Sequence, residues 1–234
     1  GDTVTFSQNA AYRDKNAGAA KPIDVTAIAL GGADAGNYAL QNTTATATSD
    51  ILARTLTATY TATPKTYDAT TAATVSGSSP DLLTGDTVTF SQNAAYRDKN
   101  AGTAKPIDVT AIALGGTDAG NYALQNTTAT ATSDILARTL TATYTATAKT
   151  YDATPAATVS GSSPDLLTGD TVTFSQNAAY RDKNAGTAKP IDVTAIALGG
   201  TDAGNYALQN TTATATADIL ARTLTATYTA TPKT

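Results

Sequence analysis

Residues Thr55–Thr63 read TLTATYTAT, a stretch in which every second residue is apolar. A period of two matches the alternation of side chains along an extended chain, so one face is apolar and the other carries five threonines. β-Branched threonine favours the extended backbone on a solvated face. The stretch is predicted to be a half-buried β-strand whose inward residues are Leu56, Ala58, Tyr60 and Ala62.

Other segments follow the same rule on either side of this strand. DTVTF (86–90) places Val88 and Phe90 inward, and IDVTAIAL (107–114) is apolar on both faces, as expected of a central strand. NYALQ and TTATAT complete the set, and turn-forming stretches such as SGSSPD, KNAG and LGGTDAGN separate the strands. No segment has helical spacing. These patterns predict an all-β unit of about six to eight strands, an Ig-like β-sandwich, with a β-grasp-like unit as the alternative.

The sequence is a tandem repeat. GDTVTFSQNAAYRDKNAG begins at Gly1, Gly85 and Gly169, which gives a period of 84 residues. A unit of this length is too long for a solenoid repeat and can fold as a small domain. The predicted domains are 51–134 and 135–218, with a partial repeat at 1–50 and the start of another unit at 219–234. A start at YDAT instead gives 1–66, 67–150 and 151–234.

The linker between units reads TSDILART (132–139) and contains neither glycine nor proline. It therefore lacks the composition of a flexible tether. Ile135 and Leu136 are expected to be buried between adjoining domains, so the array is predicted to be an elongated rod. Strands of about ten residues imply roughly 30 to 45 Å per unit.

Composition excludes several classes of function. The net charge is −4 and the pI is near 4.6, which argues against a nucleic-acid partner. The chain has no cysteine and no histidine, so disulfides, thiolate metal sites and the commonest general base are absent. Neither a membrane span nor a signal peptide is expected, and the chain reads as a fragment of something longer.

YRDKNAG occurs at 12–18, 96–102 and 180–186 and is dense in polar groups. As an active site it would use Tyr96, Asp98 and Lys99 for acid and base chemistry. Adjacent residues on a strand point to opposite faces, so Asp98 and Lys99 could not readily cooperate. We interpret the motif as a strand end with a packed tyrosine, followed by a turn at Asn100–Gly102.

A Lys–Asn isopeptide bond is a second possibility for a β-domain without disulfides. The candidate residues are lysines, asparagines and neighbouring carboxylates: Lys65, Lys99 and Lys105 with Asn93, Asn100 or Asn121, beside Asp68, Asp86 or Asp118. Ordinary surface lysines are the favoured interpretation.

Three further motifs are interpreted as structural. GGTDAGNY could offer Asp118 and Asn121 to Ca²⁺, but one carboxylate is too few for six to eight oxygen ligands. The outward threonines of 55–63 could form an ice-binding face, but a twisted sheet gives a poor lattice. The NTT sequons at Asn42, Asn126 and Asn210 are given no role. No catalytic, cofactor-binding or metal-binding residue is assigned, and no cofactor is expected.

Five ordered motifs, KTYDATTAATVSG, GDTVTF, YRDKNAG, KPIDVT and GGTDAGNY, resemble the YDG domain. This domain is a tandem repeat of large bacterial surface and secreted adhesins, related in style to MBG repeats. The resemblance covers every unit. The namesake Tyr-Asp-Gly is Tyr67-Asp68-Ala69 here. Because alanine does not easily take a positive φ, this turn is expected to be of another type or not to need glycine.

The resemblance implies no catalytic activity. It implies repeats that serve as a stalk or spacer in an extracellular adhesin of the filamentous-haemagglutinin-like kind, at the bacterial surface or secreted. The alternative is a multivalent module whose loops SGSSPD and GGTDAGN bind a glycan or a protein. The expected partners are neighbouring repeats of the same chain. Head-to-tail strand exchange between chains is a further possibility, with 219–234 supplying strands that 1–50 lacks.

Overall fold

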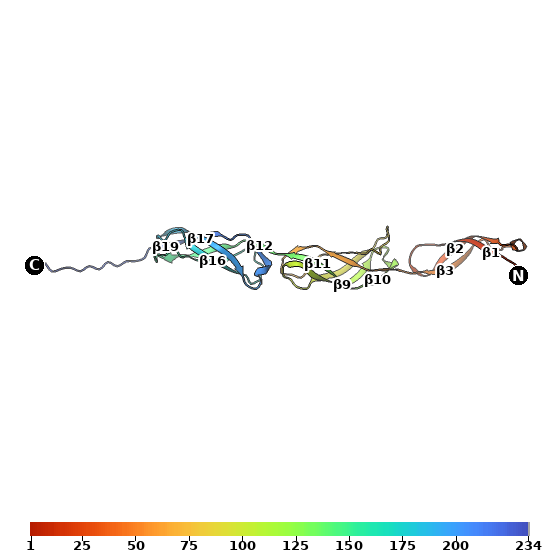
Figure 1. Ribbon diagram of the computed structural model, residues 1–234, viewed down its shortest axis with the longest axis horizontal. Coiled ribbons are helices and arrows are strands. Elements are labelled where there is room, and N and C mark those ends of the chain that lie inside the picture. Colours follow the sequence, from red (N-terminus) through yellow and green to blue (C-terminus); the bar gives the residue numbers. More distant parts are fainter. Residues whose placement is uncertain (234) are drawn as a thin grey trace. The chain divides into compact units, whose positions relative to one another are not determined.

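The computed structural model describes residues 1–233, which form β-strands and three short 3-10 helices, η1 (Ala35–Asn37), η2 (Ala119–Asn121) and η3 (Ala203–Asn205) (Figure 1). No α-helix occurs in this range. The helices of the described residues are all too short to span a membrane. The all-β prediction is confirmed.

Two compact units divide the chain, and they do not coincide with the sequence repeats. The first comprises residues 1–62, 73–95 and 106–132, and the second comprises 63–72, 96–105 and the chain from 133 onward. The division passes through the second repeat. The link between the first and second repeats lies in the first unit, and the link between the second and third repeats lies in the second unit from residue 133 onward.

The third repeat shows a complete set of strands within the second unit. The strands are β12 (Arg138–Leu140), β13 (Thr143–Thr147), β14 (Lys149–Thr150), β15 (Thr158–Ser162), β16 (Thr173–Tyr180), β17 (Gly186–Gly199), β18 (Tyr206–Leu208) and β19 (Ala213–Leu220). A four-stranded sheet has the order β14-β19-β17-β16, and β13 pairs with β15 as a separate antiparallel ribbon. Two pairings are parallel, β12 with β18 and β14 with β19.

The core of this repeat lies between the sheet and the ribbon. Ile191, Val193 and Ile219 of the sheet are almost fully buried, and Tyr144 of β13 and Val159 of β15 pack against the same cluster. Two β-layers with one apolar interior are the arrangement of a β-sandwich.

The second repeat contains the same set of strands. They are β4 (Arg54–Leu56), β5 (Thr59–Ala62), β6 (Lys65–Thr66), β7 (Val75–Ser78), β8 (Thr89–Tyr96), β9 (Gly102–Gly115), β10 (Tyr122–Leu124) and β11 (Ala129–Leu136). The sheet order is β6-β11-β9-β8, with the pairs β5-β7 and β10-β4 beside it. The repeat of the sequence is therefore a repeat of the topology.

The first repeat holds the counterparts of only the last long strands. β1 (Thr5–Tyr12), β2 (Gly18–Gly31) and β3 (Ala45–Ile51) form an antiparallel sheet in the order β1-β2-β3. It belongs to the first compact unit. The strands that would correspond to β12–β15 have no equivalent in residues 1–51.

The stretch 55–63 is not a single strand, as the alternation predicted. It is split between β4 and β5, which belong to different sheets. At the break, Asp81 accepts a hydrogen bond from the Thr57 amide at 2.9 Å, and Asn126 accepts one from the Ala58 amide at 2.8 Å. These side chains take backbone donors that a strand partner would otherwise bond. The inward face was predicted correctly, because Leu56 and Ala58 are buried.

The expected central strand is buried on one face and not on both. In β17, the pairing with β16 shifts register between Ser175 and Asn177, and Ala195 has a positive φ of 51°. A bulge at this point inserts one extra residue. Val193 and Ile196 therefore both face the core, although an unbroken strand would place them on opposite faces.

Only one of the two linker residues is buried, and its counterpart Ile219 lies in the core of its own repeat and not between domains. Ile135 is buried, with 2% of its surface exposed, but Leu136 is 52% exposed. Ile135 and Leu136 are the last two residues of β11. Successive side chains on a strand point to opposite faces, so only one of the two can enter the interior.

Candidate functional site between successive repeats

Asp170 carries a carboxylate that is almost completely removed from solvent, with 1% of its side chain exposed. It ends a turn in which its amide donates to the carbonyl of Leu167 at 3.2 Å. Its oxygens accept hydrogen bonds from the hydroxyl of Tyr206 at 2.7 Å and of Tyr67 at 2.9 and 3.1 Å. The Lys99 ammonium donates at 3.1 Å. A buried charge is costly unless it is paired, and these three donors satisfy it.

The donors come from two repeats. Tyr67 follows β6 and Lys99 lies in the turn after β8, both in the second repeat, whereas Asp170 and Tyr206 belong to the third. We call these four residues the joint cluster. All four lie in the second compact unit. The cluster therefore connects one repeat to the next.

Backbone and ring contacts fix the position of Tyr67. Its amide donates to the carbonyl of Leu136 at 2.8 Å, and the whole residue is buried. The rings of Tyr67 and Tyr206 meet edge to face, with centroids 5.7 Å apart and planes at 75°. Lys99 Nζ lies 5.8 Å from the Tyr67 ring centroid. These contacts add to the hydrogen bonds in holding the joint.

A second contact lies beside the joint cluster. Asn205 of η3 is 4% exposed, and its side-chain oxygen accepts a hydrogen bond from the Ala101 amide at 2.8 Å. Its amide group donates to the side chain of Asn100 at 3.3 Å. The turn of the YRDKNAG motif in the second repeat is thus seated on the 3-10 helix of the third.

The electrostatics of the joint cluster favour a charged pair. Burial by itself would raise the pKa of Asp170, but the hydrogen bonds from Tyr206, Lys99 and Tyr67 outweigh it and lower this pKa below its usual value. Bonding to Tyr67 and Asp170 raises the pKa of Lys99. Burial raises the pKa of Tyr206 to about 12. At neutral pH the cluster holds a carboxylate, an ammonium and two neutral phenols.

The same position is less enclosed in the earlier repeats. Asp86 accepts from the Tyr122 hydroxyl and from Lys15 Nζ, each at 2.8 Å, and 9% of its side chain is exposed. Asp2 is exposed and accepts from the Tyr38 hydroxyl at 2.9 Å. Of these three aspartates, Asp170 is therefore the most enclosed.

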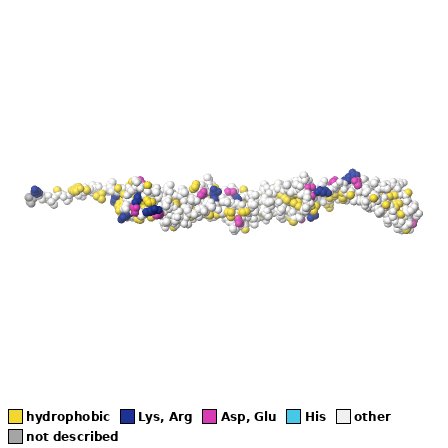
Figure 2. Space-filling view, turned by 90° about the horizontal axis from the view of Figure 1, so that it is seen from above, with side chains coloured by type: hydrophobic (Ala, Val, Ile, Leu, Met, Phe, Trp, Pro, Cys, Tyr) yellow, Lys and Arg dark blue, Asp and Glu magenta, His cyan; other side chains and the backbone are white. Residues whose placement is uncertain are grey.

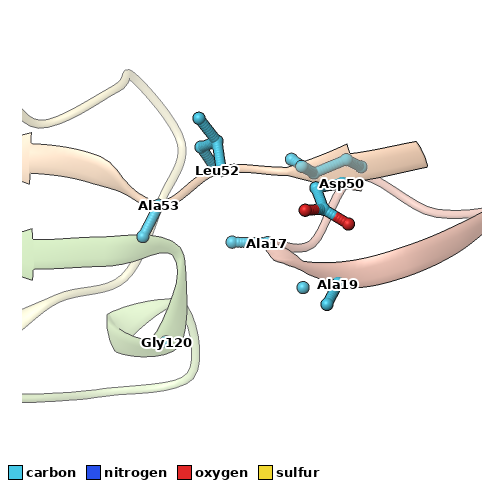
Figure 3. A pocket seen from close by; sticks show the side chains of 8 residues that line it. Ala17, Ala19, Asp50, Leu52, Ala53 and Gly120 are labelled. Carbon is cyan, nitrogen blue, oxygen red and sulfur yellow. The ribbon is translucent and has the colours of Figure 1, made fainter.

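Two cavities lie where the first repeat meets the second, within the first compact unit. One has a volume of about 350 Å³, and its walls include Lys15, Leu52, Asp86 and Tyr122. The other, of about 320 Å³, is lined by residues around the start of β2, the end of β3 with its connection to β4, and η2 (Figure 3). Tyr67 has no counterpart among residues 1–51.

The structure separates the residues of the YRDKNAG motif. Tyr96 is 3% exposed and donates to the carbonyl of Asp134 at 3.3 Å, as expected of a packing residue. Asp98 accepts from the Asn100 amide at 2.9 Å, which forms the predicted turn. Asp98 also pairs with Lys105 at 2.6 Å. Lys99 points to the next repeat, so Asp98 and Lys99 do not form an acid and base pair.

The lysines considered for an isopeptide bond are placed next to carboxylates. Lys65 Nζ lies 2.7 Å from Asp68, Lys99 Nζ 3.1 Å from Asp170 and Lys105 Nζ 2.6 Å from Asp98. The three asparagines lie elsewhere: Asn93 is exposed on β8, Asn100 bonds to Asn205, and Asn121 accepts from the Ala17 amide at 2.8 Å. The geometry is that of ion pairs.

The motifs interpreted as turns have structural partners. Asp118 accepts from the Thr87 amide at 2.8 Å, and Asn121 holds the turn of the preceding repeat. Within residues 1–233, no three acidic side chains gather as metal ligands would. Asn126, a residue of the sequons, has a role that the sequence did not suggest. It bonds both the amide and the carbonyl of Ala58 and so forms the break between β4 and β5. This break also interrupts the threonine ladder.

The YDA turn forms without glycine, and its alanine takes the positive φ that was not expected of it. Ala69 and Ala153 have positive φ values of 63° and 65°. Asp68 Oδ1 accepts from the Thr70 amide at 2.9 Å and from Lys65 at 2.7 Å, and these bonds hold the turn despite the strain at alanine. In the third repeat, bonds from Lys149 and Thr154 lower the pKa of Asp152 to about 2.

Sequence reasoning did not find the joint cluster. Tyr67 and Asp170 are 103 residues apart and belong to different repeats. No local spacing rule relates residues at this distance. One signal in the sequence could have been used. An aspartate follows the glycine in every copy of GDTVTF, although many other residues would be tolerated at this position in a solvent-exposed turn.

Comparison with known proteins identifies a family. The model of the YDG domain matches residues 1–47, 53–131 and 137–217. No curated protein and no solved structure is detectably similar to the chain.

Proposed function

Because this chain belongs to the YDG domain family, we propose that its repeats are structural spacers in a bacterial extracellular adhesin or surface filament. In this role the array carries a distal binding region away from the cell. The segment would act at the cell surface or in a secreted protein, and it would have no catalytic activity. Its partners would be the neighbouring repeats of the chain.

The observation that supports a spacer is the joint cluster. A flexible string of domains needs no buried charge between its members, whereas the Asp170 carboxylate is enclosed by side chains of two repeats. Such a joint restricts the angles that successive repeats can take. The near identity of the copies also fits a spacer, since adding a copy changes length without adding a new surface.

Small-angle X-ray scattering on chains of two, three and four repeats tests this proposal. The maximum dimension should increase by a constant step, and a 14-residue strand at about 3.3 Å per residue suggests roughly 45 Å. An Asp170→Ala variant should give a broader distance distribution at the same mass. A maximum dimension that does not grow with the number of repeats would contradict the spacer role.

A multivalent binding module is the second candidate. The loop SGSSPD borders a hollow of about 470 Å³ in the third repeat, lined by residues that include Gly161, Ser163 and Phe174. Repetition would convert weak contacts there into avidity. A glycan array probed with the three-repeat chain should then give hits that a single repeat does not give. An array without hits would leave the spacer role as the better account.

A further inference from the structure

The four-stranded sheet of the third repeat has two edges that differ in protection. One edge is β14, which has two residues and contains Lys149. The other is β16, whose eight residues, TFSQNAAY (Thr173–Tyr180), include neither a charge nor a proline. Shortness, charges and prolines are the usual means by which a protein prevents other strands from pairing with a sheet edge. β16 has none of these protections.

Only the end of β16 is covered on its open side. The Tyr180 amide donates to the carbonyl of Pro155 at 2.7 Å, and the Ala157 amide donates to the carbonyl of Ala178 at 3.3 Å. Alternate residues of an antiparallel strand bond to the same side, so the even-numbered residues of β16 direct their backbone groups away from β17. The bulge places its extra residue in β17, and this alternation therefore continues along β16.

Phe174 and Gln176 accordingly direct their amides and carbonyls to the open edge. β15 lies beside this part of β16, but within residues 1–233 no ladder joins the two strands. A Cβ added to Gly161 of β15 would lie 2.9 Å from Cβ and 3.0 Å from Cγ of Phe174. β15 thus contacts the inward side chain of Phe174, and the backbone edge at Phe174 and Gln176 has no pairing strand.

A hollow of about 470 Å³ lies along this edge. Its walls are β15, the loop after β15 and the start of β16, and none of the lining residues is charged. Serine and threonine hydroxyls line it together with the apolar side chains of Val159, Leu166 and Phe174. Charged side chains occupy separate places on the face seen in Figure 2 and leave most of that face uncharged. A charged ligand in the hollow would lose hydration without gaining an ion pair.

The same edge recurs in the second repeat. β8 has the sequence of β16 and lies at the edge of its sheet, opposite the two-residue β6. The Tyr96 amide donates to the carbonyl of Thr71 at 2.8 Å and covers the end of β8 in the same way. Residues 75–92 and 159–176 are identical, so Phe90 and Gln92 are the counterparts of Phe174 and Gln176.

We propose that the open edges of β8 and β16 each bind an extended, uncharged peptide segment of a partner protein as an added strand. An extended segment presents backbone donors and acceptors with the period of two that the edge offers, and its alternate side chains would enter the hollow. The proposal rests on the binding-module candidate and names a protein segment as the ligand in place of a glycan. Two edges in one chain would give avidity to a partner that carries the segment more than once.

Short random peptides displayed on phage and selected on the whole chain supply the probe. The enriched sequences should lack charged residues and be rich in β-branched residues, which favour the extended backbone. One enriched peptide is then synthesised, and its affinity for the chain is measured by isothermal titration calorimetry.

A pair of variants separates backbone pairing from side-chain recognition. Gln176→Pro combined with Gln92→Pro removes one outward amide from each edge and should weaken binding roughly tenfold, because a proline is tolerated there but donates no hydrogen bond. Gln176→Ala combined with Gln92→Ala loses the same side chains, including their bonds to the Tyr144 and Tyr60 hydroxyls, but keeps both amides. This control should change the affinity less than about threefold.

Hydrogen exchange of the natural chain tests the site without any substitution. Adding the synthesised peptide should slow exchange within TFSQNAAY and leave the central strands β9 and β17 unchanged. Absence of enriched peptides, equal effects of the proline and alanine pairs, or no protection of TFSQNAAY would each overturn the proposal. Glycan-array hits without peptide binding would overturn this proposal alone and leave the binding-module candidate standing. The scattering test of the spacer role is independent of all these outcomes.

Discussion

The first and third repeats share a sequence over three long strands but not an interior. In the third repeat, Tyr180 and Tyr206 are almost fully buried, and in the first repeat Tyr12 and Tyr38 are about half exposed. The sheet itself forms in both, with the same register and the same bulge. Hairpin pairing is therefore a property of the strands, whereas the core requires the segment β12–β15 to cover them.

The largest expected effect concerns the covering segment. Leu140→Ala should lower the free energy of unfolding by about 2 to 5 kcal/mol, because it removes a fully buried side chain from the core. Leu224→Ala changes the same residue in the same local sequence, where it is exposed, and should cost less than about 0.5 kcal/mol in the monomer. Urea unfolding at low protein concentration measures both. Equal losses of unfolding free energy for Leu140→Ala and Leu224→Ala would contradict the difference in burial between these two leucines.

The next effect concerns Asp170 and its counterparts Asp86 and Asp2, which differ in burial. Asp170→Ala should cost about 1 to 3 kcal/mol, because two buried hydroxyl groups and the Lys99 ammonium lose their acceptor. Asp86→Ala should cost less, and Asp2→Ala least, since Asp2 is exposed. The order of the three thermal midpoints is the measurement. A loss at Asp2 as large as that at Asp170 would contradict a role for burial.

The joint should also be sensitive to acid. The pKa of Asp170 is lower in the folded chain than its unfolded value of about 4, so its contribution to stability is full above that value and is lost as the pH falls through the folded pKa. Other aspartates titrate in this range as well. The comparison is therefore the fall in melting temperature between pH 7 and pH 2.5 for the natural chain and for Asp170→Asn. The variant should show the shallower fall, and identical slopes would exclude a contribution from this carboxylate.

The smallest effect concerns the YDA turn. Ala153→Gly should raise stability by about 0.5 kcal/mol, because glycine relieves a left-handed strain of roughly 1 to 2 kcal/mol that exceeds its own entropic cost. Ala207→Gly is a matched control on the exposed edge of β18 and should lower stability by about 0.5 to 1 kcal/mol. Differential scanning calorimetry can compare the two. If both substitutions lowered the stability, the positive φ of Ala153 would not determine the effect of glycine at this position.

Local patterns predicted several parts of the molecule correctly. The alternation in 55–63 identified the inward residues Leu56 and Ala58, and the polar crowding of YRDKNAG was interpreted as a turn beside a packed tyrosine. These features depend on side chains within a few residues of one another. The break at Ala58 was not predicted, because it depends on Asn126, which is 68 residues away.

The joint cluster is the clearest case of information that no local pattern contains. The sequence analysis considered Lys99 beside Asp98 and as a candidate for a bond to an asparagine, but its actual partner is Asp170, 71 residues away in another repeat. Leu136 was assigned to the interior by its hydrophobicity, but the alternation of β11 left room for Ile135 alone. Hydrophobicity states a preference, and strand geometry decides which of two neighbours can satisfy it.

The sequence by itself determined that the chain is all-β, that it repeats every 84 residues and that the two complete copies form the same strands, because these properties arise from alternation and turn chemistry within each copy. The tertiary structure alone decided which of two neighbouring apolar residues enters the core, as with Ile135 and Leu136, and where the charged residues of the YRDKNAG turn find their partners. The reason is that burial depends on what lies against a surface. Identical residues such as Tyr12 and Tyr180 therefore differ in exposure although their own sequence does not.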